Sequence, residues 1–152
     1  MLINLCCGTY VYDGWLCCDP KTDLDPRIVD WRWGEPIPTG NETAEGILVT
    51  HSWIYAAKED HPKHLAECLR VLKPGGVLVI KEEDDRKRVW RKVGTNHSSG
   101  LIRSTSNEPE MKVLMEAAGF QVEHGYPPEF EGPLDNHRKA RKNAYVLTGK
   151  KV

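Results

Sequence analysis

The sequence lacks any apolar run that approaches the roughly 20 residues needed to cross a bilayer. Its first residues also lack the basic start and the small-residue cleavage site of a signal peptide. Charge of one sign is missing too, because 21 basic and 22 acidic residues leave a net charge of −1. Such a balance gives no general attraction to nucleic acid or to a membrane surface. With no internal repeat visible, we expect one soluble domain that spans residues 1–152 and makes no membrane contact.

Cysteine is present but in a pattern that argues against disulfides. Four of the five cysteines form the adjacent pairs Cys6-Cys7 and Cys17-Cys18. Neighbouring cysteines rarely bridge each other, and within strand-like runs cysteine behaves as a small buried apolar residue. A metal site built from the two pairs is the alternative, but zinc ligands are usually separated by two or more residues. We therefore expect reduced thiols, no metal, and a cytoplasmic location.

The most informative stretch lies in the middle of the chain. Leu65, Cys68, Leu69 and Leu72 recur at the three- and four-residue spacing of one helix face. Lys73-Pro74-Gly75-Gly76 then ends the helix, because proline cannot continue it and glycine tolerates the left-handed backbone. The apolar run that follows has strand length and suits a strand covered on both faces. This stretch predicts a helix, a turn and a buried strand.

Similar patterns organise the rest of the sequence. Strands alternating with helices indicate a parallel sheet with right-handed crossovers, and a final pair without an intervening helix indicates an antiparallel hairpin. Proline, glycine and asparagine mark residues 31–45 as a loop, and the segments Glu82–Ser106 and 125–143 are expected to be loops as well. The expected strands are 2–5, 15–18, a short one within 25–30 that ends at Asp30, 47–50, 77–80, 120–122 and 143–148, and the expected helices are 58–72 and 107–118.

The N-terminal strand is followed by residues that point to a family. The turn reads Asn4-Leu5-Cys6-Cys7-Gly8, a Gly14-Trp15 pair precedes the second strand, and Asp19 follows that strand. Together with the helix and turn described above, this pattern resembles the class I S-adenosylmethionine (SAM) dependent methyltransferases. The resemblance covers nearly the whole chain. It implies an α/β fold with a doubly wound, mostly parallel seven-stranded sheet and an antiparallel C-terminal hairpin, in a minimal version that lacks N-terminal helices.

The resemblance also implies residues that bind SAM, with S-adenosylhomocysteine as the product. The turn after the first strand, with Asn4, Cys6 and Gly8, lets the backbone approach the methionine part of SAM, although Cys6 replaces a glycine of the family pattern. Asp19 accepts hydrogen bonds from both ribose hydroxyls, for which a carboxylate offers two oxygens. Alternatively, Asp19 is part of an ordinary solvated turn at Asp19-Pro20.

The next two expected strand ends supply the remaining candidates. Asp30 lies where the family contacts the adenine amino group, and Trp31 beside it could lie against the ring; their alternatives are a surface carboxylate and a packing tryptophan. Thr50 and His51 lie at the tip of a strand, where ligands of open α/β sheets bind. His51 is the candidate catalytic base, since imidazole can accept a proton near neutral pH. A structural, hydrogen-bonded histidine is the alternative.

Nucleic acid is a possible partner that the sequence does not favour. The 137–142 segment, His-Arg-Lys-Ala-Arg-Lys, could touch phosphate but has no aromatic residues among its charges. The Asn-Pro-Pro-Tyr and Asp-Pro-Pro-Tyr motifs of amino-methylating DNA enzymes and the Pro-Cys motif of cytosine-C5 enzymes are missing. The missing N-terminal cover leads us to expect either weak SAM binding or a homodimer, with Tyr10, Tyr12, Trp31 and Trp33 near an open cleft.

The expected function is transfer of the SAM methyl group to an oxygen or nitrogen of an unidentified acceptor. Two alternatives remain open. One is an enzyme on the same scaffold that cleaves SAM, and the other is a non-catalytic SAM-binding or protein-interaction module. The altered glycine turn and the loss of a Glu-His pair that often follows the counterpart of His51 favour the second alternative. Turnover in the presence of SAM binding would separate an enzyme from a module.

Overall fold

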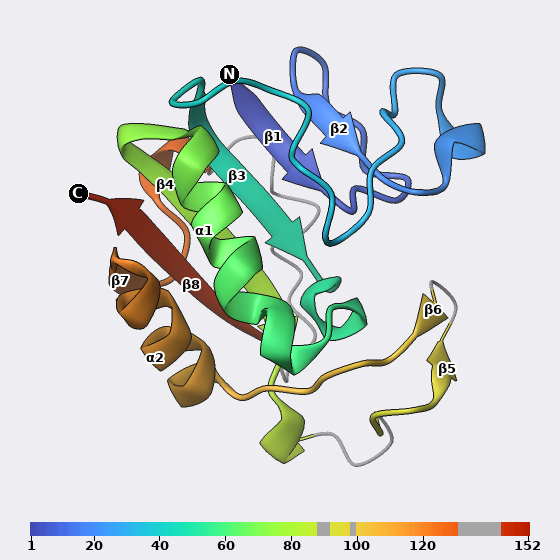
Figure 1. Ribbon diagram of the computed structural model, residues 1–152, viewed down its shortest axis with the longest axis vertical. Helices are drawn as coiled ribbons and strands as arrows, with labels where there is room; N and C mark the ends of the chain where they lie inside the picture. Colours follow the sequence, from blue (N-terminus) through green and yellow to red (C-terminus); the bar gives the residue numbers. More distant parts are fainter. Residues whose placement is uncertain (88–91, 98–99, 131–143) are drawn as a thin grey trace.

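A six-stranded sheet forms the centre of the protein in a computed structural model that describes residues 1–87, 92–97, 100–130 and 144–152 (Figure 1). Along the sheet the strands follow the order β2-β1-β3-β4-β8-β7. Their bounds are Leu16–Cys18 for β2, Leu2–Leu5 for β1, Ala44–Thr50 for β3, Leu72–Glu83 for β4, Ala144–Lys151 for β8 and Phe120–His124 for β7.

Strand directions confirm the expected α/β class. Strands β2, β1, β3 and β4 are mutually parallel, whereas β8 runs antiparallel to both of its neighbours, β4 and β7. The mostly parallel sheet and the closing antiparallel hairpin were both expected from the sequence. Since β1, β2 and β3 are parallel, their carboxyl ends meet at one edge, where ligands of such sheets bind.

Among the described residues the sheet has six strands, one fewer than the seven that the resemblance implies. Within 25–30, where a short strand was expected, a single parallel bridge joins Val29 to Cys18. Val29 donates its N–H to Cys17 and accepts the N–H of Asp19, but the N–H of Ile28 turns back to Asp25. Pro26 has no N–H to offer, so the pairing cannot extend toward the start of this segment.

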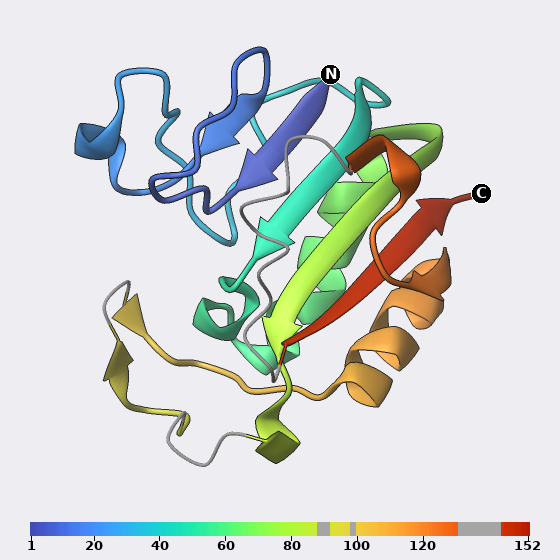
Figure 2. The same cartoon turned by 180° about the vertical axis from the view of Figure 1, so that it is seen from behind.

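Helices of the described residues cover one face of the sheet rather than both, which differs from the doubly wound expectation (Figures 1 and 2). Helix α1 spans His61–Val71 and α2 spans Glu108–Ala118. Only the ten residues 6–15 connect β1 to β2, which is too short for a parallel crossover through a helix. On the opposite face Leu48, Val79 and Phe130 form a small buried cluster.

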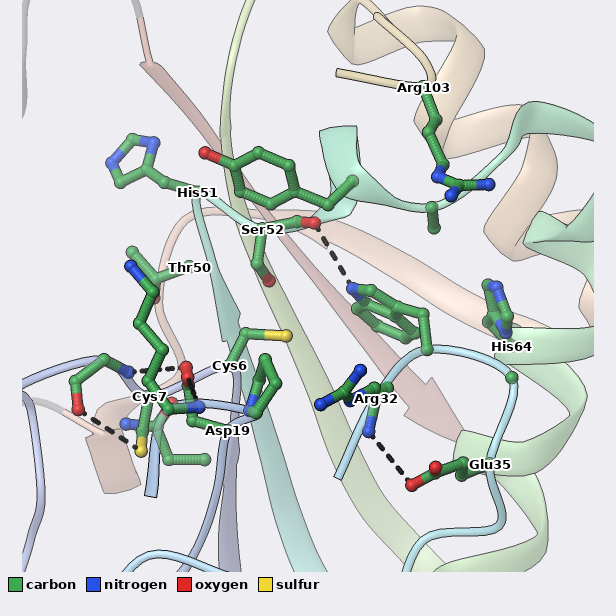
Figure 3. Close-up of a pocket in the computed structure, with 18 of the residues that line it drawn as sticks. Cys6, Cys7, Asp19, Arg32, Glu35, Thr50, His51, Ser52, His64 and Arg103 are labelled. Atoms are coloured by element: carbon green, nitrogen blue, oxygen red, sulfur yellow. Dashed lines mark hydrogen bonds between the residues drawn. The ribbon is translucent and has the colours of Figure 1, made fainter. Parts of the chain in front are cut away.

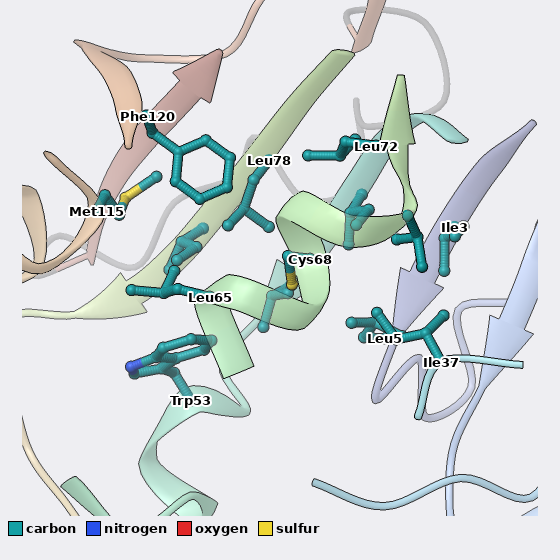
Figure 4. Packing of buried hydrophobic residues seen from close by; sticks show 14 of the residues in the cluster. Ile3, Leu5, Ile37, Trp53, Leu65, Cys68, Leu72, Leu78, Met115 and Phe120 are labelled. Carbon is teal, nitrogen blue, oxygen red and sulfur yellow. The ribbon is translucent and has the colours of Figure 1, made fainter. Parts of the chain in front are cut away.

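The main core lies between the sheet and these two helices (Figure 4). Leu65 and Cys68 of α1 and Met115 of α2 are fully buried against Leu78 of β4. Their spacing is the helical pattern seen in the sequence, and Phe120 closes the same cluster beyond α2. This packing fixes the sheet, and therefore the edge at which its parallel strands end.

Both predicted helices form near their predicted bounds. Asn107 caps α2 in a capping box with Glu110, and Gly119 ends the helix in the left-handed conformation with φ +107°. Strand β4 is much longer than the predicted 77–80, since Leu72 already pairs with Ala44 across a register shift that contains the Pro-Gly-Gly turn. The turn therefore lies inside an irregular strand.

Short elements complete the described chain. No helix among the described residues is long and apolar enough to cross a membrane. The basic segment 137–142 and the apolar residues 89–90 of the predicted loop lie outside the described residues. Turns of 3₁₀ helix are η1 Thr22–Leu24, η2 Trp53–Tyr55, η3 Lys58–Asp60, η4 Asp85–Lys87 and η5 Pro128–Phe130, and β5 Asn96–His97 pairs with β6 Gly100–Leu101 in a small hairpin.

Candidate active site

A cavity of about 1110 Å³ opens at the carboxyl ends of β1, β2 and β3 (Figure 3). Pockets for small molecules commonly measure roughly 300–1,000 Å³, so this one has room for a large ligand. Six of the eight candidate cofactor residues line it: Asn4, Cys6, Gly8, Asp19, Thr50 and His51. The sequence therefore predicted most of one wall of the cavity.

The turn after β1 forms the floor of this wall. Cys6 and Gly8 both adopt left-handed backbone conformations, with φ +55° and +54°. A left-handed conformation costs a non-glycine residue about 1–2 kcal/mol, so Cys6 is strained where the family pattern has glycine. Asn4 is buried and its amide donates to the carbonyl of Tyr10 at 2.9 Å, which holds the far end of the turn. The turn thus forms despite the substitution.

Asp19 joins the first two strand ends. Its Oδ2 accepts the backbone N–H of Gly8 and its Oδ1 accepts that of Lys21, both at 2.9 Å. The side chain is nearly buried yet lines the cavity. Each carboxylate oxygen can accept a second hydrogen bond. Asp19 therefore shapes the turn and still presents acceptors to a ligand.

The end of β3 contributes a second strained residue. His51 has φ +50°, and its N–H donates to the carbonyl of Lys81 at 2.8 Å. Its Nδ1 lies 3.7 Å from Oε1 of Glu82, a carboxylate with no exposed surface. Lys81 is also nearly buried and lines the cavity. A histidine and a buried carboxylate thus lie close together where β3 and β4 end, and Lys81 lines the same cavity.

Aromatic and histidine rings form the opposite wall. Trp33 packs with its ring centroid 5.0 Å from that of Trp53 and 4.9 Å from that of His64. The indole N–H of Trp33 donates to the carbonyl of Ser52 at 3.3 Å (Figure 3). Burial lowers the pKa of His61, behind this wall, from 6.5 to about 4, and lowers that of His64 in the same direction. Burial therefore favours the neutral form of both rings.

Two predicted cofactor residues, Asp30 and Trp31, do not line the cavity. Trp31 is buried in the main core, where its indole N–H donates to the carbonyl of Glu35 at 3.1 Å. The side chain of Asp30 is exposed to solvent. Trp33, two residues later, provides the aromatic surface of the cavity instead.

Sequence reasoning missed several ionisable residues that line the cavity or lie beside a residue of its wall. Lys81 and Glu82 directly follow the apolar run 77–80, so the rule that placed Thr50 and His51 at a strand end applied to them as well. His64 lies on α1 at the spacing of the core face, and no local signal separates it from core residues. Arg103 comes from the chain after β6, which only the tertiary structure brings to the cavity.

Four of the five cysteines are not poised for nucleophilic chemistry. All five are free, and burial raises the pKa of Cys6, Cys7, Cys18 and Cys68 to about 12. A thiol with so high a pKa is protonated at neutral pH and reacts slowly. Within the described part of the chain, no group of three or more histidine, cysteine or acidic side chains could hold a metal ion.

Comparison with protein families gives one match, a methyltransferase domain over residues 32–80. That segment contains the predicted helix, turn and strand. Solved methyltransferase structures match nearly the whole chain at low sequence identity. The chain has the class I methyltransferase fold. No curated protein matches the chain.

Three structures illustrate the likeness of this fold to those of solved methyltransferases. A SAM-dependent methyltransferase of Thermotoga maritima, described as a possible histamine N-methyltransferase, is 16% identical, with 99% of this chain and 82% of that one covered and a TM-score of 0.63. A Haloferax volcanii putative methyltransferase, solved in complex with its Trm112 activator, is 14% identical with 98% and 80% covered and a TM-score of 0.71.

The third is the 1,6-didemethyltoxoflavin-N1-methyltransferase of Burkholderia thailandensis, solved with S-adenosylhomocysteine bound. It is 17% identical, with 99% of this chain and 70% of that one covered and a TM-score of 0.63. The chain is thus similar to a methyltransferase domain over residues 32–80, and it shares its fold with solved SAM-dependent methyltransferases.

Proposed function

We propose that this methyltransferase domain transfers the methyl group of SAM to an oxygen or nitrogen atom of a small acceptor that enters the same cavity. One observation carries the proposal: the left-handed turn at Gly8, the nearly buried carboxylate of Asp19 and the strand end at His51 line one cavity of about 1110 Å³. That cavity lies outside the carboxyl ends of parallel strands, where ligands of open α/β sheets bind.

The residues present fit SAM. A Cβ added to Gly8 would meet no atom within 4 Å, so the cavity beside this turn is open to a ligand. We assign the ribose hydroxyls to Asp19, whose two oxygens each accept one backbone N–H and can each accept another hydrogen bond. Trp33 offers an aromatic surface to the adenine ring. Adenine contacts by Asp30 and Trp31 stay a prediction from the resemblance.

When bound, SAM supplies an electrophilic methyl group whose bond to the sulfonium sulfur breaks with both electrons left on sulfur. The chain itself has to align the acceptor and exclude competing water. Tyr55, Lys81 and Arg103 line the cavity around His51 and can orient the acceptor. His51 is placed to accept a proton when the acceptor must lose one.

Titration calorimetry with SAM and S-adenosylhomocysteine tests the cofactor site. We expect Asp19→Asn to weaken binding about 10- to 100-fold, since hydrogen bonds to a charged group contribute about 1.5–3 kcal/mol. Asp30→Asn is the matched control, because it removes the same charge outside the cavity and should leave the affinity unchanged. Loss of binding in Asp30→Asn would instead favour the adenine contact that the resemblance implies.

A second ligand separates ribose binding from damage to the turn. The 2′-deoxy analogue of S-adenosylhomocysteine should bind the wild type more weakly, yet bind Asp19→Asn about as well as the parent compound does. If the wild type and Asp19→Asn lose the same affinity for the 2′-deoxy analogue, Asp19 only holds the backbone at Gly8 and Lys21 and does not contact the ribose. A wild type that binds neither SAM nor S-adenosylhomocysteine at millimolar concentration would overturn the proposed function.

The fate of the methyl group decides between the alternatives. Incubation with SAM labelled in the methyl group should move the label to an acceptor and leave S-adenosylhomocysteine. A SAM-cleaving enzyme would instead release a fragment other than S-adenosylhomocysteine, and a binding module would bind SAM without turnover.

We further propose a cytoplasmic location, which the five free cysteines support. No helix among the described residues is long and apolar enough to span a membrane. A homodimer that covers the open cavity also remains a proposal. Sedimentation velocity with and without S-adenosylhomocysteine tests it, since a dimer that completes the site should become more populated with the ligand.

A further inference from the structure

His51 and Glu82 form a pair that the sequence did not reveal. His51 directly follows β3 and Glu82 lies near the end of β4, and these strands are adjacent and parallel. Nδ1 of the imidazole lies 3.7 Å from Oε1 of the carboxylate, and this carboxylate is completely buried. Oε1 also accepts the N–H of Glu83 at 2.9 Å, which fixes its position. The pair therefore joins a rigid carboxylate to a residue of the cavity wall.

The backbone of His51 supports a functional role. Its φ of +50° is uncommon for a residue other than glycine, and such strained residues gather at active sites. The conformation is held by the bond from its N–H to the carbonyl of Lys81. The strained backbone of His51 is independent of the contact between its side chain and Glu82, so two separate observations point to His51.

The ring also has a defined inner and outer side. Nδ1 has almost no accessible surface and no hydrogen-bond partner, whereas the side chain as a whole is 25% exposed. The exposure therefore belongs to other atoms of the side chain, and His51 is one of the residues that line the cavity. Catalytic hydrogen bonds are often long without substrate and shorten in the complex, which fits a distance of 3.7 Å.

We propose that Glu82 is a positioning residue that holds His51 with its proton on Nδ1, so that Nε2 accepts a proton from the methyl acceptor. This inference rests on the proposed function and narrows its acceptor to a compound that presents a hydroxyl or an N–H group. In that step the O–H or N–H bond breaks, its electron pair stays on the acceptor atom, and the proton moves to Nε2. The resulting imidazolium is balanced by the carboxylate of Glu82.

The charged and ionisable groups around the pair come from several elements. Lys81 of β4 and Tyr55 of η2 line the cavity beside His51, and Tyr145 of β8 lies on the Glu82 side. The hydroxyl of Tyr145 is hydrogen-bonded to that of Ser106 at 3.0 Å. A carboxylate beside Nδ1 has a specific effect that these groups lack: it fixes which nitrogen carries the proton.

Nitrogen-15 NMR of the histidine rings in the free protein tests the positioning directly. With His51→Asn used to assign the signal, neutral His51 of the wild type should show the proton on Nδ1. In Glu82→Leu the proton should move toward Nε2, the tautomer that free imidazole prefers. Glu83→Leu is the matched control, since it removes the neighbouring buried carboxylate and should leave the tautomer unchanged.

A proton on Nε2 in the wild type would overturn the proposal, because the nitrogen on the cavity side could then not accept one. That measurement stands even if Glu82→Leu does not fold. It also needs no SAM, so failure of the proposed function and failure of this inference are distinguishable. Glu82→Gln keeps the size of the side chain and an acceptor for Nδ1–H, and should keep the tautomer.

Transfer assays then test the acceptor class. With methyl-labelled SAM, acceptors from a panel of phenols, hydroxy acids and imidazoles should take up label, whereas thioethers should not. On such an acceptor, Glu82→Gln should lower kcat on the order of 10²-fold at an unchanged KM, and Glu82→Asp should recover part of it. The proposal would be overturned if only thioethers took up the label, or if kcat were unchanged in Glu82→Gln.

Discussion

Three residues with positive φ, Cys6, Gly8 and His51, border the cavity at the ends of two adjacent strands. Glycine adopts this conformation at little cost, whereas cysteine and histidine are held in it by their surroundings. Cys6 is part of a turn tied to Asp19, and His51 is tied to β4. At the scale of single residues, backbone strain therefore gathers where the chain would meet its ligand.

Buried histidines make a prediction about acid stability. The pKa of His61 is lowered by burial to about 4, below its ordinary value of 6.5. Between pH 4 and 6.5 the imidazole of His61 is protonated in the unfolded chain but not in the native protein. The part of the free energy of unfolding that is fully present above pH 6.5 is therefore lost as the pH falls to 4. We expect the free energy of unfolding to fall by roughly 3 kcal/mol over this range.

Urea unfolding at pH 7, 5.5 and 4.5 measures this effect. His61→Gln should be less stable than the wild type at pH 7 but should lose less stability on acidification. His124→Gln, which changes an exposed histidine, is the control. Parallel pH curves for the wild type and His61→Gln would contradict the assignment of the acid loss to His61.

At the scale of elements, local signals predicted the helices well. The capping box of α2 joins Asn107 and Glu110, and Gly119 ends the same helix. We expect Asn107→Ala to lower the free energy of unfolding by about 1 kcal/mol, because an N–H at the helix start then loses its partner. Equilibrium denaturation measures this, with Asn107→Asp as the variant that should keep the cap.

Strand pairing depended on signals beyond each strand. The segment 25–30 predicted a short strand, yet it forms a single bridge because Pro26 and the turn at Ile28 limit its hydrogen bonds. In contrast, β4 extends through a Pro-Gly-Gly turn because β3 pairs with it on both sides of a register shift. Neither outcome follows from the apolar pattern of one segment.

At the scale of the whole molecule, ligand binding and folding are linked. A ligand that binds only the native protein stabilises it by about 2.7 kcal/mol at a concentration 100 times its Kd. For a chain of this length we expect S-adenosylhomocysteine to raise Tm by roughly 5–10 °C under that condition. Differential scanning fluorimetry measures the shift, which should be reduced in Asp19→Asn and retained in Asp30→Asn at equal ligand concentration. The absence of a shift in the wild type would contradict binding at this cavity.

The sequence by itself determined the class of fold and most of one cavity wall. Apolar periodicity, the cap of α2 and the turn residues around Gly8 are local properties, so neighbouring residues suffice to set them. The tertiary structure decided which side chains meet across the chain. It placed Trp33 rather than Trp31 at the cavity and brought Glu82 to His51. Such contacts join different strands and loops, and they depend on sheet order and register, which no single segment encodes.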